Sequence, residues 1–135
     1  MTYLFDTDTL SSLLKRIPSA MLLAKLASVP VAEQATSAIT LGELIYGAAR
    51  LGPRGTTLRA RIERDLIANL AILPFDAEAA RYYGQLRANL ENQGTPLAEA
   101  DLRIAAIAIT RGLILITGNG RHCGRIADLT VENWL

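Results

Sequence analysis

The sequence is poor in several residue types, and each shortage limits what the protein can be. Cys123 is its single cysteine, which excludes an internal disulfide framework and favours a reducing, cytoplasmic setting. The only histidine is the adjacent His122, so no pair of residues has the spacing of a zinc site. No apolar run approaches the ~18 uninterrupted residues of a membrane span. The N-terminus lacks a basic region before an apolar stretch, so we expect neither a signal peptide nor a membrane anchor.

Lysine is also scarce: only Lys15 and Lys25 occur among the 14 basic residues, and the rest are arginines. Arginine forms bidentate contacts with phosphate, which would suit a nucleic-acid partner. A bias in genome composition would produce the same usage, and the net charge of +1 favours neither reading. Charge alone therefore does not identify a partner.

The chain does have a large share of hydrophobic residues, 50% of its 135 positions, which predicts one globular domain over residues 1–135. Short apolar runs alternate with helical patterns that begin and end at turn residues. The predicted strands cover 3–5, 35–39, 71–75, 113–117 and 129–134, and the predicted helices cover 9–16, 18–28, 40–51, 56–70, 76–92 and 95–111. This alternation predicts an α/β fold with a short, mainly parallel sheet.

Acidic residues follow the ends of predicted strands, where ligands bind in parallel α/β sheets. Asp6 and Asp8 come directly after the first strand, and Glu43 comes shortly after the second. Each also has an ordinary structural explanation. Asp8 is placed to cap the following helix, and Thr40 and Glu43 have the spacing of a capping box.

Asp101 is harder to explain by structure alone. It lies in the second turn of the helix predicted from Thr95 or Pro96, too late to cap it, and its neighbours at helical spacing are apolar. Aspartate is a poor helix former and is rarely buried without a partner. The structural alternative is an ion pair with a buried arginine from another segment.

The segment after the fourth predicted strand contains further polar residues. Asn119 is a candidate site residue or simply a loop residue between two glycines. Weaker candidates for substrate contacts lie around it: Thr117, Arg121, His122 and Arg125. The neighbouring cysteine is expected to be a small packed side chain.

Asp6, Glu43 and Asp101 come from three separate elements, and each is expected to reach the same edge of the sheet. Two carboxylates ~4 Å apart repel by about 1 kcal/mol in water and about 4 kcal/mol at an effective dielectric of 20. Such a cluster is tolerated when a divalent cation neutralises it, and oxygen ligands favour Mg²⁺ or Mn²⁺. Such an ion activates water and stabilises charge on a phosphodiester, so the residues predict metal-assisted phosphodiester hydrolysis.

Four segments in this order resemble the PIN-domain ribonucleases, and specifically the VapC toxins of bacterial toxin–antitoxin pairs. They are YLFDTDTLSSLL at 3–14, TLGELIYGA at 40–48, GTPLAEADLRIAAIAI at 94–109 and LILITGNGRHCGRIADLTVENW at 113–134. The resemblance covers almost the whole chain. It implies a PIN-like three-layer α/β/α domain and an endoribonuclease.

The resemblance also implies roles for particular residues and partners. Asp6, Glu43 and Asp101 would bind Mg²⁺ or Mn²⁺, and Asn119 stands where many members carry a fourth acid. An asparagine adds a carbonyl oxygen but no charge. The expected partners are an RNA substrate, a cognate VapB-like antitoxin that fills the groove, and a second copy of the chain. Apolar and aromatic residues at 45–51 and 80–90 are candidates for the oligomer face, unless they pack the core.

Two other readings remain open. DTDT at 6–9 matches the opening motif of haloacid-dehalogenase-like phosphatases, but these need a lysine well downstream, and the chain has none beyond Lys25. Alternatively, Asn119 could mark an inactive PIN-like domain that only binds RNA or protein.

Overall fold

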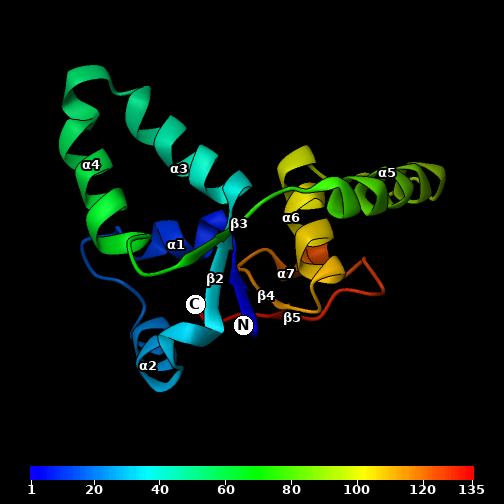
Figure 1. Ribbon diagram of the computed structural model, residues 1–135, viewed down its shortest axis with the longest axis horizontal. Helices are drawn as coiled ribbons and strands as arrows, with labels where there is room; N and C mark the ends of the chain where they lie inside the picture. The colour runs from blue at the N-terminus through cyan, green and yellow to red at the C-terminus, as the bar shows by residue number, and fades with distance from the viewer.

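A five-stranded sheet forms the centre of the protein, seen in the computed structural model, which describes residues 1–135 (Figure 1). The strands are β1 (Tyr3–Phe5), β2 (Gln34–Ser37), β3 (Ala71–Leu73), β4 (Ile114–Ile116) and β5 (Val131–Glu132). All pair in parallel in the order β3-β2-β1-β4-β5. The strand order reverses between β1 and β4, which places the expected ligand site at the carboxyl ends of these two strands.

Helices cover both faces of this sheet. The α-helices are α1 (Thr7–Ser12), α2 (Ala20–Ser28), α3 (Ala38–Ala49), α4 (Thr56–Arg61), α5 (Ala77–Asn92), α6 (Glu99–Thr110) and α7 (Gly120–Cys123). The shorter helical segments are η1 (Val31–Glu33), η2 (Gly52–Gly55) and η3 (Ile62–Leu66). No helix is both long and apolar enough to cross a bilayer.

Alternate residues of the central strands bury against opposite layers. Leu4 and Leu115 pack in the cluster that contains residues of α6, such as Ile107. Phe5 and Ile116 pack in the other cluster, with residues of α1 to α4 and with Trp134. The predicted three-layer α/β/α architecture is thus confirmed, and Figure 1 shows α5 and α6 on one side and α1 to α4 on the other.

Several predicted element boundaries were wrong, and those at helix starts matter most for the site. The helix predicted from residue 9 begins at Thr7, because Asp6 rather than Asp8 is its N-cap. The helix predicted from Thr40 begins at Ala38, with Ser37 as N-cap. The helix predicted from Thr95 begins only at Glu99 and ends, as expected, before Gly112, whose positive φ of 66° suits glycine.

The remaining differences concern short segments. The helix predicted over 56–70 is α4 followed by a π-type turn, η3, and the last strand is shorter than predicted. The loop expected after the fourth strand contains the one-turn helix α7. The aliphatic residues Leu86 and Leu90 of α5 pack the core, whereas Tyr46 of α3 is 68% exposed.

Candidate active site

Asp6 lies where β1 ends and α1 begins, and its side chain is only 6% exposed. Its Oδ1 accepts a hydrogen bond of 2.8 Å from the backbone N–H of Thr9. The hydroxyl of Thr9 in turn donates to the carbonyl oxygen of Ile116 at the end of β4, at 2.9 Å. The cap therefore fixes one carboxylate oxygen at the junction of the two strands where the strand order reverses.

Glu43 lies in the second turn of α3, free of the capping role that the sequence suggested. Ser37 caps this helix by accepting from the N–H of Thr40 at 3.0 Å. Glu43 is exposed, and its Oε1 accepts a hydrogen bond of 2.5 Å from the hydroxyl of Thr7 at the start of α1. This bond joins Glu43 to the residue that follows Asp6, so the two acids are held on neighbouring elements.

We expect Thr7→Val to lower RNA cleavage about tenfold, because Glu43 loses the donor that orients it, while stability falls by less than ~1 kcal/mol. Thr7→Ser keeps the hydroxyl and serves as the matched control. The measurement is the initial rate of RNA cleavage together with urea unfolding of each variant. Equal activity of the valine and serine variants would show that this hydrogen bond does not position Glu43.

Asp101 lies in the first turn of α6, not in the second turn as predicted, and is half-buried. No arginine pairs with it; its partner is Asn119, whose Nδ2 lies 3.5 Å from Oδ2 of Asp101. Asn119 precedes α7 and does not cap it with its side chain. The structure thus brings Asp101 and Asn119 together from opposite ends of the α6–β4 unit.

The acids share one electrostatic environment. Burial raises the pKa of Asp101, and the negative charges of Asp8 and Glu43 raise it further, against smaller opposing effects of His122 and Asn119. Burial likewise raises the pKa of Asp6, with Asp8 adding to it and hydrogen bonds from threonines opposing it. Each of these carboxyl groups therefore holds a proton more readily than usual until a cation neutralises the cluster.

Asp8 is the site residue that the sequence reasoning assigned to another role. The structure gives capping to Asp6, which leaves the Asp8 side chain exposed near the start of α1. Its charge acts on Asp101 and Asp6, and it makes the smallest contribution to the raised pKa of the Cys123 thiol, which burial, then Asp101 and Asp6, bring to about 12. The sequence feature that points to Asp8 is its position two residues after Asp6, because an Asp6 cap leaves the Asp8 side chain free.

The donor atoms suit Mg²⁺ or Mn²⁺, since all candidate ligands are carboxylate or amide oxygens. As the side chains stand, no three His, Cys, Asp or Glu residues converge closely enough to hold one ion. Magnesium usually keeps several of its waters and is bound directly by one or two carboxylates, so a loose cluster of this kind fits it. Asp6, which is buried, and Asp101, which is half-buried, are the two carboxylates that would bind such an ion away from bulk solvent.

The weaker candidates divide into two groups. Thr117 is fully buried, and its hydroxyl accepts from the N–H of Asn119 at 2.9 Å, so it braces the turn after β4. The other three, Arg121, His122 and Arg125, are exposed on α7 and the turn that follows it. We call these three exposed residues the basic border; among them, His122 acts on an acid of the site, since its charge lowers the pKa of Asp101. Cys123 is buried, as predicted.

Known proteins share the sequence pattern and the fold of this chain. Residues 3–129 match the PIN domain family. A Salmonella typhimurium protein named tRNA(fMet)-specific endonuclease VapC is 33% identical over 99% of this chain and 98% of its own. The crystal structure of FitAcB from Neisseria gonorrhoeae matches with a TM-score of 0.88 at 33% identity, covering 98% of this chain and 97% of that one. VapBC2 from Rickettsia felis, bound to a promoter DNA fragment, matches with a TM-score of 0.89 at 29% identity over the full length of both chains.

The parallel α/β fold is that of a PIN domain, and the chain belongs to the PIN domain family. Within that family it is a ribonuclease of the VapC group, the toxin members of VapBC toxin–antitoxin systems. PIN-domain ribonucleases generally depend on divalent metals.

Proposed function

We propose that the protein hydrolyses RNA phosphodiester bonds with Mg²⁺, or Mn²⁺, held by Asp6, Glu43 and Asp101, acting in the cytoplasm as the toxin of its pair. The observation that carries the assignment is that neither the buried Asp6 nor the half-buried Asp101 forms a salt bridge, and His122 offsets the charge of Asp101 only in part. Buried carboxylates without a compensating charge are costly unless the site binds a cation.

When bound, the metal supplies an activated water and a positive charge for the phosphodiester oxygens. The chain's own residues orient this chemistry. The N–H of Thr9 fixes Oδ1 of Asp6, the hydroxyl of Thr117 also stabilises the Asp6 carboxylate, and Thr7 holds Glu43. Asn119 orients Asp101 by its amide, and Asp8 supplies the negative charge that Asn119 lacks.

The basic border on α7 would hold the substrate backbone. Arg121 and Arg125 are exposed and form no ion pair with the protein, so their guanidinium groups are free for phosphate. Because similar proteins are named tRNA(fMet)-specific endonucleases, we propose structured RNA as the substrate class and initiator tRNA as the first substrate to test.

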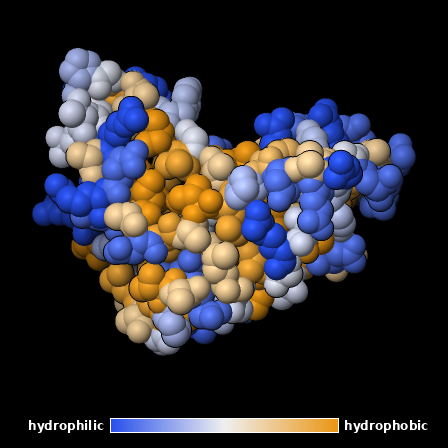
Figure 2. Space-filling model, viewed as in Figure 1, coloured by the Kyte–Doolittle hydropathy of each residue, from blue (hydrophilic) through white to orange (hydrophobic).

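The cognate antitoxin is proposed to bind between the α3–α4 arm and α1. A groove of about 250 Å³ lies there, lined by apolar residues such as Leu44, Leu51 and Leu58, with Glu43 at its edge. Figure 2 shows apolar side chains gathered in the hollow beside this arm. A segment seated in the groove would cover Glu43, which accounts for inhibition.

A second copy of the chain is proposed to bind the other side of α3. A hollow of about 440 Å³ there is lined by Ile39, Tyr46 and Ala100, again with Glu43 among its residues. The exposed Tyr46 ring is the type of aromatic side chain that is enriched at interfaces. Antitoxin and second copy would thus meet on the two sides of one active-site helix.

The experiment that tests the function is cleavage of total RNA by the purified protein, with the ends mapped by sequencing. We expect cleavage with Mg²⁺ or Mn²⁺, loss of cleavage with EDTA, and recovery when excess Mg²⁺ is restored. Binding of RNA without cleavage under all these conditions would favour the inactive adaptor instead. A phosphoryl group trapped on Asp6 would favour the phosphatase.

A further inference from the structure

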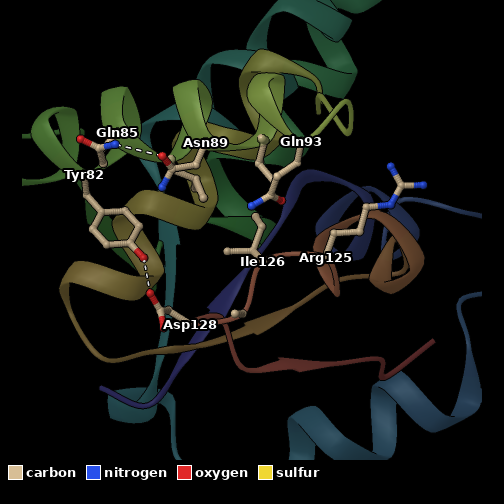
Figure 3. Close-up of a pocket in the computed structure, with 10 residues that line it drawn as sticks. Tyr82, Gln85, Asn89, Gln93, Arg125, Ile126 and Asp128 are labelled. Atoms are coloured by element: carbon tan, nitrogen blue, oxygen red, sulfur yellow. Dashed lines mark hydrogen bonds between the residues drawn. The ribbon is translucent and has the colours of Figure 1, made fainter.

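A separate pocket of about 320 Å³ lies between α5 and the turn at 125–128, away from the acids (Figure 3). Its floor is apolar and well packed, because Leu86, Leu90 and Ile126 are each less than 10% exposed. Amide side chains rather than charges line its α5 side. Small-molecule sites commonly combine an apolar floor with a few convergent polar groups in this way.

The amides follow one face of α5 at four-residue spacing: Gln85, Asn89 and Gln93. Nε2 of Gln85 donates to Oδ1 of Asn89 at 3.0 Å, as Figure 3 shows. This bond leaves the Gln85 carbonyl oxygen as an acceptor and the Asn89 amino group as a donor. The free acceptor and the free donor lie at opposite ends of this pair (Figure 3), and the hydrogen-bonding edge of each of the four bases offers partners for both.

The opposite wall supplies an aromatic ring and a cation. The hydroxyl of Tyr82 donates to Oδ2 of Asp128 at 2.8 Å, which fixes the ring at one end of the pocket. Arg125 lies at the other end, beside Gln93 (Figure 3), and forms no ion pair with the protein. Aromatic rings stack bases and arginines contact phosphates in sites for unpaired RNA.

The pocket is connected to the candidate active site through α7. His122, whose charge acts on Asp101, precedes Arg125 by three residues, and the N–H of Arg125 bonds to the carbonyl of His122 at 3.3 Å. The turn between these two residues therefore links the basic border to the rim of the pocket. An RNA strand crossing α7 would bring a neighbouring nucleotide to the amide pair.

We propose that this pocket binds an unpaired nucleotide of the RNA strand that the active site cuts. The inference rests on the proposed ribonuclease function and adds a nucleotide-binding site to it. The pocket would bind the RNA and fix which phosphodiester bond faces the acids, while the acids perform the chemistry.

Direct binding tests the pocket independently of cleavage. Non-cleavable 2′-O-methyl hexanucleotides of each base are titrated against the wild-type protein and followed by fluorescence anisotropy. We expect each of the four oligomers to bind, because the pocket offers a ring, a cation and amide groups that suit any base. We also expect AMP to shift the side-chain amide NMR signals of Gln85 and Asn89.

Asn89→Ala removes the free donor, and Asn92→Ala is the matched control, because Asn92 is an exposed asparagine of the same helix outside the pocket. We expect Asn89→Ala to weaken binding of the adenine oligomer and to raise KM about five- to tenfold, with kcat unchanged. Asn92→Ala should match the wild type in both measurements.

The possible failures are distinct. Normal cleavage with equal behaviour of the two alanine variants would overturn the pocket and leave the nuclease intact. Oligonucleotide binding that depends on Asn89, without any cleavage, would support the pocket and overturn the nuclease. Shifts of the amide signals by the antitoxin but not by AMP or the oligomers would overturn the nucleotide assignment.

Discussion

Replacing Asp6 with asparagine is expected to lower RNA cleavage about 10³-fold while the protein stays folded, because a metal ligand contributes several kcal/mol to the transition state. Asparagine caps a helix about as well as aspartate, so the bond to the N–H of Thr9 is retained. The change removes the charge without removing the cap. Initial cleavage rates and urea unfolding of the same preparations measure the two effects separately.

The chain provides a matched control at Asp76. Like Asp6, this residue follows a strand and caps the next helix, with its Oδ1 accepting from the N–H of Ala79 at 2.9 Å. It lies outside the acidic cluster and pairs with Arg111 instead. Asp76→Asn should therefore keep full cleavage. A similar loss in both variants would assign the effect to folding, and an active Asp6→Asn protein would contradict the proposed metal site.

Strands β1 and β4 could be predicted from the sequence because strands buried on both faces are often continuous apolar runs, whereas β2 is buried although it contains Gln34, Thr36 and Ser37. YLF at 3–5 and ILI at 114–116 have no polar residue, and both lie in the middle of the sheet. The acids that follow strand ends could be found for the same reason, since parallel strands bring their carboxyl ends to one edge. This reasoning places Asp6 at the carboxyl end of β1, where it lies in the structure.

Helix starts were less predictable, because several residues near each start can act as caps. Asp6 and Asp8 both precede the first helix, and Ser37 and Thr40 both precede the third. The choice at α1 is reinforced by a long-range bond from the Thr9 hydroxyl to the end of β4, which no local pattern contains. The bond favours the helix start at which Asp6 is the cap and Asp8 is free. A local sequence pattern therefore could not tell that Asp8 is available for the site.

The side-chain contacts of the site were also harder to predict than its location, because they depend on how separate elements pack. Glu43 was expected near Asp6 from topology, but its hydrogen bond to Thr7 depends on how α1 and α3 pack. Asp101 was singled out because it lacked a local partner, and its contact with Asn119 depends on the turn after β4. Periodicity identifies the elements, whereas side-chain packing between them determines the site.

Without divalent ions, the wild-type protein is expected to lose stability relative to Asp101→Asn as pH rises. The pKa of Asp101 is raised above its ordinary value of 3.8, mainly by burial and then by Asp8 and Glu43. The folded state therefore binds more protons than the unfolded state just above pH 3.8, and the free energy of unfolding falls as pH rises through the folded pKa. The asparagine variant lacks this titration.

Urea unfolding between pH 4 and pH 8 measures the difference between the two proteins, with Asp65→Asn as a control for an exposed acid paired with Arg64. A difference that grows in favour of the wild type with rising pH would contradict the assignment. Mg²⁺ should reverse the trend for the wild type, by about 2.7 kcal/mol when its concentration is 100 times Kd, because the ion binds only the folded, ionised cluster. Asp101→Asn should respond much less. An equal response of both proteins to Mg²⁺ would show that the ion binds elsewhere.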